Sequence, residues 1–383
     1  MKLIYVCSRD VSVYESQVLS LLSFMYHNGI DVTLLQGYKN EIEKKSIERK
    51  LEAFPYLNVV WFELGVSLPH KENEKKKILF QAISSIPNYQ NSILHIRGIY
   101  TSYLIREIFK KNNLSIPILF DNRGLGLEED RYTASKGSFF TKLFYTFNSY
   151  YTAYIYKKFY VADGYPLFIT SVSPLINDYI KKHYPQCTYP QFFHPNIAGR
   201  QFVYSESGRN EIREKMGFDK QDVIAVCSTN GNAVWQKDAL TISTLVNMGI
   251  KVINLSNYDP KIKGCTTIKV KFTEMPKYLS AADIAVLWRD NVLINNAASP
   301  SKFSEFAAMG LYVIHNDSVY VASNYIRNNN AGCIVTDIEQ IPNVIDFDEV
   351  TENRENRIRC GMDTFGIDKL GASYIELYKE MTK

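Results

Sequence analysis

Short apolar runs alternate with helical patterns along the first part of the chain. The run at residues 3–7 is rich in branched and aromatic side chains and predicts a buried strand. Apolar residues at positions 18, 19, 22, 24 and 25 then predict a helix that ends at Asn28 and Gly29, and residues 30–35 predict a second strand. A strand, a helix and a strand in about 35 residues indicate a βαβ unit and therefore a parallel sheet.

The alternation continues through two series of elements. In the first series, further strands are predicted at residues 59–62, 93–96, 116–120 and 169–172, with helices at 99–111 and at 136–160. A proline-rich stretch at residues 184–196 follows, and the second series then has strands at 223–227, 252–255, 267–270, 284–287, 312–314 and 333–335. We therefore expect an α/β fold of two Rossmann-like, doubly wound domains that face a cleft and divide near residues 195–205. A ligand is expected in that cleft, at the carboxyl ends of the strands.

The composition agrees with two ordinary domains. The chain has 383 residues, of which 46% are hydrophobic and 22% charged, which excludes a disordered, collagen-like or coiled-coil protein. The net charge of +4 is too small to indicate nucleic-acid binding. The six cysteines lack metal-ligand spacing, and neither a signal peptide nor an 18-residue apolar stretch is visible, so we expect free thiols and a cytoplasmic location.

Tyrosine is unusually common, with 27 Tyr against 3 Trp. Residues 136–160 contain six of these Tyr and five Phe but no Asp or Glu, and a stripe at helical spacing comprises Phe140, Phe144, Phe147, Tyr151, Tyr154 and Lys158. A basic, aromatic helix at 136–160 is a candidate for binding a membrane surface. The alternative is a core helix whose aromatic side chains pack on the first sheet.

The clearest local motif lies at residues 298–314. Pro300 suits the first turn of a helix and Gly310 suits its end, so the motif predicts a helix from about Ser299–Ser301 to Met309. The helix N-terminus, together with Ser299, Ser301 and Lys302, would bind a diphosphate, and Glu305 lies one turn further on, where it would accept both hydroxyls of a ribose. The alternative is an amphipathic helix with a capping serine.

This motif resembles the P-x-K-x-x-E-x-x-A-x-G-x-x-V-I motif of retaining glycosyltransferases with the GT-B fold, family 4 and its relatives. The resemblance implies that Ser301 and Lys302 bind the donor diphosphate and that Glu305 binds the ribose. Many members have a second Glu about eight residues earlier, whereas position 297 here is Ala. Weaker resemblances, in the family's order, lie at residues 118–129, 162–173, 194–202 and 278–287.

The resemblance also implies that the segment after the first strand of the second domain binds the phosphates of the donor. The residues implied there are Ser228, Asn230, Gly231 and Lys237, although without the resemblance the pattern favours a solvated helix lysine at Lys237. In the first domain, Asp121 and Glu129 follow a predicted strand and are expected at the cleft, with Arg97 and Arg123 as acceptor-side residues. The alternative for Asp121 is a strand-end carboxylate that pairs with Arg123.

Together with the resemblance, these observations predict a glycosyltransferase that moves a sugar from a nucleotide-diphosphate donor to a hydroxyl of a glycan. The resemblance implies a lipid-linked acceptor, a role in surface polysaccharide biosynthesis and retention of configuration. Residues 1–197 would bind the acceptor and residues 198–365 the nucleotide sugar, and the resemblance implies that a helix at 366–383 crosses back to the first domain. Catalysis is assigned to Asp121, Glu129 and Lys302, without a metal or other cofactor and without nucleic acid. The protein could lie peripherally at the inner face of the cell membrane. The alternatives are a nucleotide-sugar epimerase of the same shape and a non-catalytic sugar-binding component of a glycan assembly complex.

Overall fold

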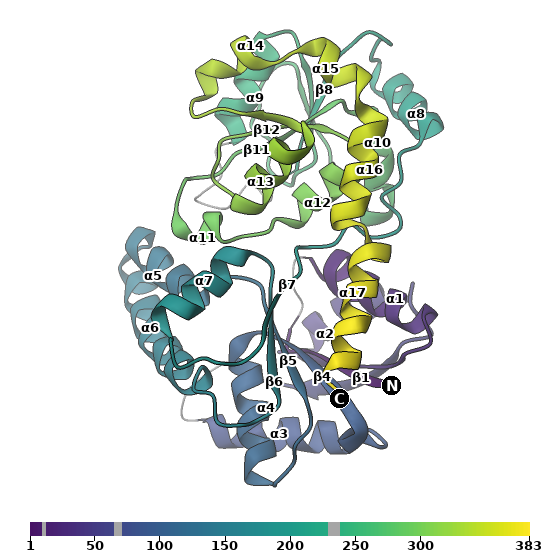
Figure 1. The fold of residues 1–383 in the computed structure, drawn as a ribbon. Helices are drawn as coiled ribbons and strands as arrows, with labels where there is room; N and C mark the ends of the chain where they lie inside the picture. Colours follow the sequence, from purple (N-terminus) through teal and green to yellow (C-terminus); the bar gives the residue numbers. More distant parts are fainter. Residues whose placement is uncertain (10–12, 65–70, 229–237) are drawn as a thin grey trace. The chain divides into compact units, whose positions relative to one another are not determined.

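The computed structural model describes residues 1–9, 13–64, 71–228 and 238–383 (Figure 1). The chain divides into two compact units, one comprising Met1–Pro195 with Gly371–Lys383 and the other comprising Asn196–Leu370. Each unit is built on one parallel sheet flanked by helices, so the expected α/β class with two doubly wound domains is confirmed.

The first unit contains a seven-stranded sheet in the order β3-β2-β1-β4-β5-β6-β7, and all neighbouring strands are parallel. Its strands are β1 (Lys2–Cys7), β2 (Asp31–Tyr38), β3 (Asn58–Glu63), β4 (Ser92–Arg97), β5 (Ile118–Asn122), β6 (Leu167–Ser171) and β7 (Gln191–Phe193). Its helices are a π-helix (Tyr14–Leu19), α1 (Ser20–His27), α2 (Glu41–Leu51), α3 (Glu72–Ser84), a 3-10 turn (Tyr89–Asn91), α4 (Ile99–Lys111), α5 (Gly126–Lys136), α6 (Phe139–Phe159) and α7 (Pro174–His183). The central strands are covered on both faces, which explains why they appear in the sequence as continuous apolar runs.

The second unit contains a six-stranded parallel sheet in the order β10-β9-β8-β11-β12-β13. Its strands are β8 (Ile224–Cys227), β9 (Lys251–Asn254), β10 (Cys265–Thr267), β11 (Ile284–Leu287), β12 (Tyr312–His315) and β13 (Gly332–Ile334). Its helices are α8 (Glu206–Met216), α9 (Asp238–Asn247), α10 (Met275–Ala281), α11 (Leu293–Asn296), α12 (Ser301–Ala308), α13 (Tyr320–Asn329), α14 (Ile341–Val344), α15 (Phe347–Glu352) and α16 (Arg354–Phe365), with 3-10 turns at Phe272–Glu274 and Ile338–Gln340. The last helix, α17 (Ile367–Glu380), contains the division between the two units.

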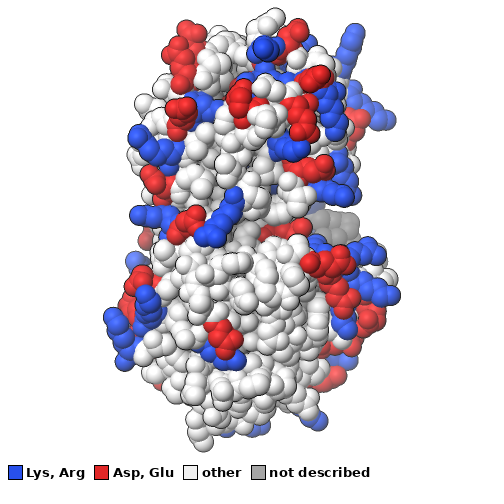
Figure 2. Space-filling model, turned by 90° about the vertical axis from the view of Figure 1, so that its right-hand side faces the viewer, with Lys and Arg blue, Asp and Glu red and all other residues white. Residues whose placement is uncertain are grey.

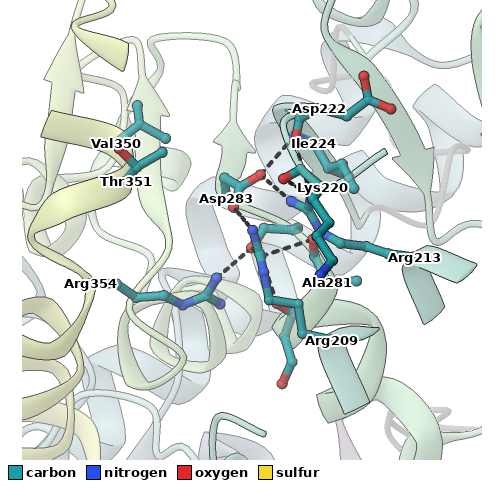
Figure 3. A network of polar contacts seen from close by, with 12 residues as sticks. Arg209, Arg213, Lys220, Asp222, Ile224, Ala281, Asp283, Val350, Thr351 and Arg354 are labelled. Atoms are coloured by element: carbon teal, nitrogen blue, oxygen red, sulfur yellow. Dashed lines mark hydrogen bonds and ion pairs between the residues drawn. The ribbon is translucent and has the colours of Figure 1, made fainter. Parts of the chain in front are cut away.

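A buried ion network fixes the helices of the second unit to its sheet (Figure 3). The carboxylate of Asp283 accepts hydrogen bonds from Arg209 Nη2 and Arg213 Nη2, both at 2.7 Å, and from the backbone N–H of Ile224 at 2.9 Å. The same arginines donate to backbone carbonyls at the end of α10, and Arg354 Nη1 donates to the carbonyl of Ala282 at 2.7 Å. Asp283 in the segment 278–287 therefore serves the fold in the structure.

The C-terminal part of α17 packs on the sheet of the first unit. Tyr374 and Tyr378 are buried, and the hydroxyl of Tyr378 lies 2.6 Å from Nδ1 of His95 on β4. The Tyr374 ring stacks on His194 with 4.1 Å between the ring centroids.

The helical region predicted at 136–160 is broken at Gly137 and Ser138, which separate α5 from α6. The two helices lie side by side, because Asn148 and Thr152 of α6 both donate to the carboxylate of Asp130 on α5, at 2.8 and 2.9 Å. The opposite face of α6 is exposed, with Phe140 80%, Phe144 60% and Phe147 67% accessible. Packing of the aromatic stripe in the core is therefore wrong for these three residues, and the buried residues of α6 are Ile155, Tyr156 and Phe159.

Two sheet details differ from the sequence predictions. Strand β10 ends at Thr267, where the pattern predicted a strand at 267–270, and β7 was not predicted because its three residues lie within the proline-rich stretch. On the face shown in Figure 2, Lys and Arg side chains are mixed with Asp and Glu, without a broad patch of one sign. None of the helices in the described ranges is long and apolar enough to cross a membrane.

Candidate functional site

The carboxyl ends of β1, β4 and β5 surround a pocket of about 540 Å³ in the first unit. This volume is in the range of about 300–1,000 Å³ that is typical of small-molecule sites. Four residues singled out in the sequence line the pocket together, namely Arg97, Asp121, Arg123 and Glu129. They meet there because parallel strands direct all their carboxyl ends to one edge of the sheet.

Asp121 is held in a network of hydrogen bonds and charges at the end of β5. Its carboxylate accepts a hydrogen bond from Arg123 Nε at 2.7 Å, and Nε2 of His95 lies 3.6 Å away. Burial opposes ionisation of Asp121, which is 1% exposed, but the charge of Arg123, and next the contact with His95, outweigh it and hold the pKa of this carboxyl well below its usual range. The ion pair between Asp121 and Arg123, one of the two interpretations of the sequence, is therefore present in the structure.

Glu129 has a different environment on the first turns of α5. Its carboxyl lies against Gly124, where the Cβ of any other residue would overlap Oε1 of Glu129. Burial, and next the neighbouring charge of Asp130, raise the pKa of Glu129. Of the two pocket carboxylates, Glu129 is the one better suited to accept a proton from a hydroxyl group at neutral pH.

In the second unit, α12 begins at Ser301 after Pro300 and is followed by Gly310 with φ +66°, so the predicted limits of this helix are confirmed. Asn196 anchors its first turn. The Asn196 backbone N–H donates to Ser299 Oγ at 3.1 Å, its Nδ2 donates to Ser301 Oγ at 3.3 Å, and its carbonyl accepts from Ser304 Oγ at 2.7 Å. The hydroxyls of Ser299 and Ser301 are thus ordered before any ligand binds.

Lys302 and Glu305 form an ion pair along the same helix, with 2.8 Å between Nζ and Oε2. Glu305 is 1% exposed, and its burial raises the pKa of the carboxyl, whereas Lys302 acts in the opposite direction. Lys302 is one-third exposed and Glu305 is buried, and both lie in the first turns of the helix. When a ligand is present, the lysine can instead bind its negative charge and the glutamate can bind its hydroxyls.

Ser228 comes directly after β8 and is buried. Because β8 and β11 are adjacent and parallel, Ser228 lies at the same edge of the sheet as the segment that leads from β11 to α12. The other residues predicted in this turn, Asn230, Gly231 and Lys237, lie outside the described residues.

Two further features bear on the chemistry. Ala297, at the place of the resembled family's second Glu, is fully buried, and the nearby Asn295 donates to the carbonyl of Asp290 at 2.8 Å. Within the ranges that the structure describes, no three or more His, Cys, Asp or Glu side chains gather as a metal site would require.

The whole chain is similar in structure to known nucleotide-sugar enzymes. A glycosyltransferase from Rickettsia africae matches with a TM-score of 0.69, covering 100% of this chain and 98% of that one at 14% sequence identity. HepE from Anabaena, solved in complex with UDP and glucose, matches with a TM-score of 0.68, covering 98% and 99% at 10% identity. The chain has the GT-B fold.

A weaker similarity concerns a protein from Listeria monocytogenes assigned as a UDP-N-acetylglucosamine 2-epimerase, with a TM-score of 0.53, coverage of 99% and 95%, and 11% identity. No protein-family model matches the sequence, and no curated protein sequence is significantly similar to it. At these identities the matches establish the fold, and the roles of individual residues rest on the geometry above.

The sequence did not point to several residues of these two sites. Arg9, Tyr100 and Tyr156 line the pocket, and Asn196 orders the start of α12. Arg9 follows the predicted first strand, so the rule that places Asp121 at the sheet edge applies to it as well. Asn196 lies in the resembled segment 194–202 and Tyr156 in the aromatic stretch 136–160, but neither pattern assigned these two residues to a site.

Proposed function

We propose that this protein is a glycosyltransferase that transfers a sugar, with retention of configuration, from a nucleotide-diphosphate donor to a hydroxyl of a glycan during surface polysaccharide biosynthesis. The observation that carries the proposal is the pair formed by Lys302 and Glu305 in the first turns of α12, in a chain with the GT-B fold. A buried carboxylate beside a lysine at a helix N-terminus offers one group for a ribose and one for a diphosphate.

On the donor side, Ser301 and Lys302 would bind the diphosphate and stabilise the charge that develops as it leaves, with Lys237 as a further cation. Glu305 would accept hydrogen bonds from the ribose hydroxyls. As in the resembled family, we propose that this charge is met by lysines and by the N-terminus of α12 and that no metal is required. The complexes of HepE make UDP the first nucleotide to test.

On the acceptor side, the pocket of the first unit would bind the glycan. Glu129 would hold the attacking hydroxyl and accept its proton, because its pKa is raised, whereas Asp121 is already committed to Arg123 and His95. Asp121 would then act through Arg123, whose orientation it fixes. Most of the rate enhancement would come from placing the acceptor hydroxyl and from electrostatic stabilisation.

The exposed face of α6 supports an acceptor that is attached to a lipid. This face, which we call the aromatic face, carries seven exposed large apolar side chains: Phe139, Phe140, Leu143, Phe144, Phe147, Tyr150 and Tyr154. Exposed Lys157 and Lys158 follow at the end of the helix, and no acidic residue lies in α6. Aromatic and basic residues on one side of a helix are typical of binding to an anionic bilayer surface.

Membrane binding is tested by co-sedimentation with vesicles of phosphatidylcholine, with and without phosphatidylglycerol. The triple variant Phe140→Ser, Phe144→Ser, Phe147→Ser should lose binding to anionic vesicles. The matched control is Ile42→Ser, because Ile42 is 82% exposed on α2, away from the aromatic face. Equal sedimentation of the wild type and the triple variant would contradict the proposal.

Transferase function is tested by incubating the protein with a panel of nucleotide sugars and measuring binding, nucleotide release and product formation, with and without glycan-lipid extract. Stabilisation by one donor and extract-dependent transfer are expected. Conversion of the donor without any acceptor would instead identify an epimerase, which is the activity assigned to one structural neighbour. Tight binding without turnover in any extract would identify a sugar-binding component.

A further inference from the structure

The pocket of the first unit is more cationic than a neutral sugar requires. Three arginines line it, Arg9, Arg97 and Arg123, against the two carboxyls of Asp121 and Glu129. We infer that this pocket binds a phosphate or diphosphate group of the acceptor, an inference that rests on the proposed function because it names the acceptor's chemistry. Four observations carry it, from Arg97, the start of α4, Lys75 and the size of the pocket.

Arg97 lies at the end of β4 with one guanidinium nitrogen left unsatisfied by the described residues. Its Nη1 is buried and has no hydrogen-bond partner among the described residues, and Arg97 forms no ion pair with any of them. Its register neighbour on β5, Asp121, is already bound by Arg123. A buried guanidinium N–H without an acceptor is costly, and a ligand oxygen in the pocket would relieve that cost.

The N-terminus of α4 opens into the same pocket. Gly98 is the N-cap, with φ +94°, and offers no side chain to the first N–H groups of this 13-residue helix. The next three residues, 99–101, line the pocket. Unoccupied N–H groups at a helix N-terminus favour an anion, and together with Arg97 they provide donors from two directions.

Lys75 of α3 is a second, buried cation behind the lining of the pocket. It is 3% exposed, its Nζ has no hydrogen-bond partner among the described residues, and it lies 5.2 Å from the centroid of the Tyr100 ring, which lines the pocket. Burial first, and then the charge of Arg9, lower the pKa of Lys75. A buried ammonium that contacts a tyrosine ring but has no hydrogen-bond acceptor among the described residues destabilises the free protein, so its presence is explained if an anion in the pocket compensates for it.

The geometry favours phosphate over other groups. Arginine binds phosphate oxygens in pairs, and a helix N-terminus binds them through its backbone N–H groups. The volume of about 540 Å³ leaves room for a sugar beside a phosphate, next to Glu129. Two sources share this chemistry, a sugar phosphate and the diphosphate of a lipid carrier.

The test is calorimetric titration of inorganic pyrophosphate into the full-length protein at about 0.15 M ionic strength. All variants carry Lys302→Ala, so that binding at the proposed donor site contributes little. Adding Arg97→Gln should weaken pyrophosphate binding ten-fold or more, whereas adding Arg49→Gln, an exposed arginine of α2, should leave it unchanged. Equal affinity of the Arg97→Gln and Arg49→Gln proteins would overturn the inference and would leave the proposed function standing if UDP still bound to the wild type.

The substitution Lys75→Met distinguishes a lysine that supports anion binding in the pocket from a lysine that only stabilises the fold. The substitution should weaken pyrophosphate binding several-fold and raise the melting temperature of the free protein, because it removes an unpaired buried charge. A fall in melting temperature with unchanged binding would overturn the role of Lys75. Farnesyl diphosphate and glucose 6-phosphate, titrated in parallel, distinguish the sources, since tighter binding of the first indicates a lipid carrier and of the second a phosphorylated sugar.

Discussion

The substitution Glu305→Gln tests the donor site most directly. The side chain is 1% exposed and the amide keeps its shape, so the change removes a charge and little else. If the carboxylate accepts two ribose hydroxyls, both hydrogen bonds lose their ionic character, which weakens each by about 0.5–1.5 kcal/mol. UDP binding should therefore weaken by about 1–3 kcal/mol, a change in Kd of roughly 5- to 150-fold.

The companion substitution Lys302→Ala removes the ammonium that lies 2.8 Å from Glu305 in the free protein. It takes one charged donor from the diphosphate, worth about 1.5–3 kcal/mol, and so should weaken UDP and UDP-sugar binding ten-fold or more. It also leaves a buried carboxylate without its cation, which should lower the stability of the second unit.

Both effects are measured by isothermal titration calorimetry with UDP, and folding is checked by thermal unfolding of each variant. Glu214→Gln on α8 is the matched control, because Glu214 is an exposed helix carboxylate of the same unit. If UDP binds equally well to both α12 variants and to the control, the pair is only an internal ion pair of an amphipathic helix. The donor-site assignment would then be refuted.

Three further predictions concern stability. Asp283→Asn should lower the free energy of unfolding by about 3–5 kcal/mol in urea titrations, because buried Arg213 and half-buried Arg209 lose their counter-charge. Burial, and next the charge of His95, lower the pKa of His194 to about 4, so the unfolded chain binds the proton more tightly. Stability should therefore fall by at most about 3 kcal/mol between pH 6.5 and pH 4, and His194→Asn should flatten this dependence. Gly361→Ala should cost about 1–3 kcal/mol, because its Cβ would overlap the carbonyl oxygen of Ala307 in α12, and a normal melting temperature would contradict this.

The sequence predicts the fold well because parallel sheets have a strong local signature. Strands covered on both faces appear as apolar runs, and each run is followed by a helical pattern. The limits of α4 and α12 agree with the prediction because glycines mark their ends, Gly98 before α4 and Gly310 after α12. The three residues of β7 carry no such signal, since a short strand beside prolines depends on pairing with β6.

The candidate sites were predictable only where one strand or one helix carries the residues. Asp121 follows a predicted strand, and Lys302 and Glu305 share a helix, so simple spacing locates all three. Lys75 contacts the ring of Tyr100, which is 25 positions away in the sequence. Asn196 binds Ser299, which is more than 100 positions away. Such contacts depend on the packing of the folded unit, which no periodicity in the sequence encodes.

The aromatic face of α6 shows why periodicity alone could not decide between a core helix and a surface helix. An apolar stripe has the same spacing whichever way it faces, so the decision depends on what the other side of the helix contacts. Here Asn148 and Thr152 donate hydrogen bonds to Asp130 on α5, so their side of α6 faces α5. Arg106 Nη1 donates to the carbonyl of Phe159 and holds the end of α6. These polar contacts fix the rotation of α6 and turn the phenylalanines outward, the reverse of an ordinary surface helix. A rotation fixed in this way exposes apolar area at a cost to the free protein, and binding of that face to a bilayer would offset the cost.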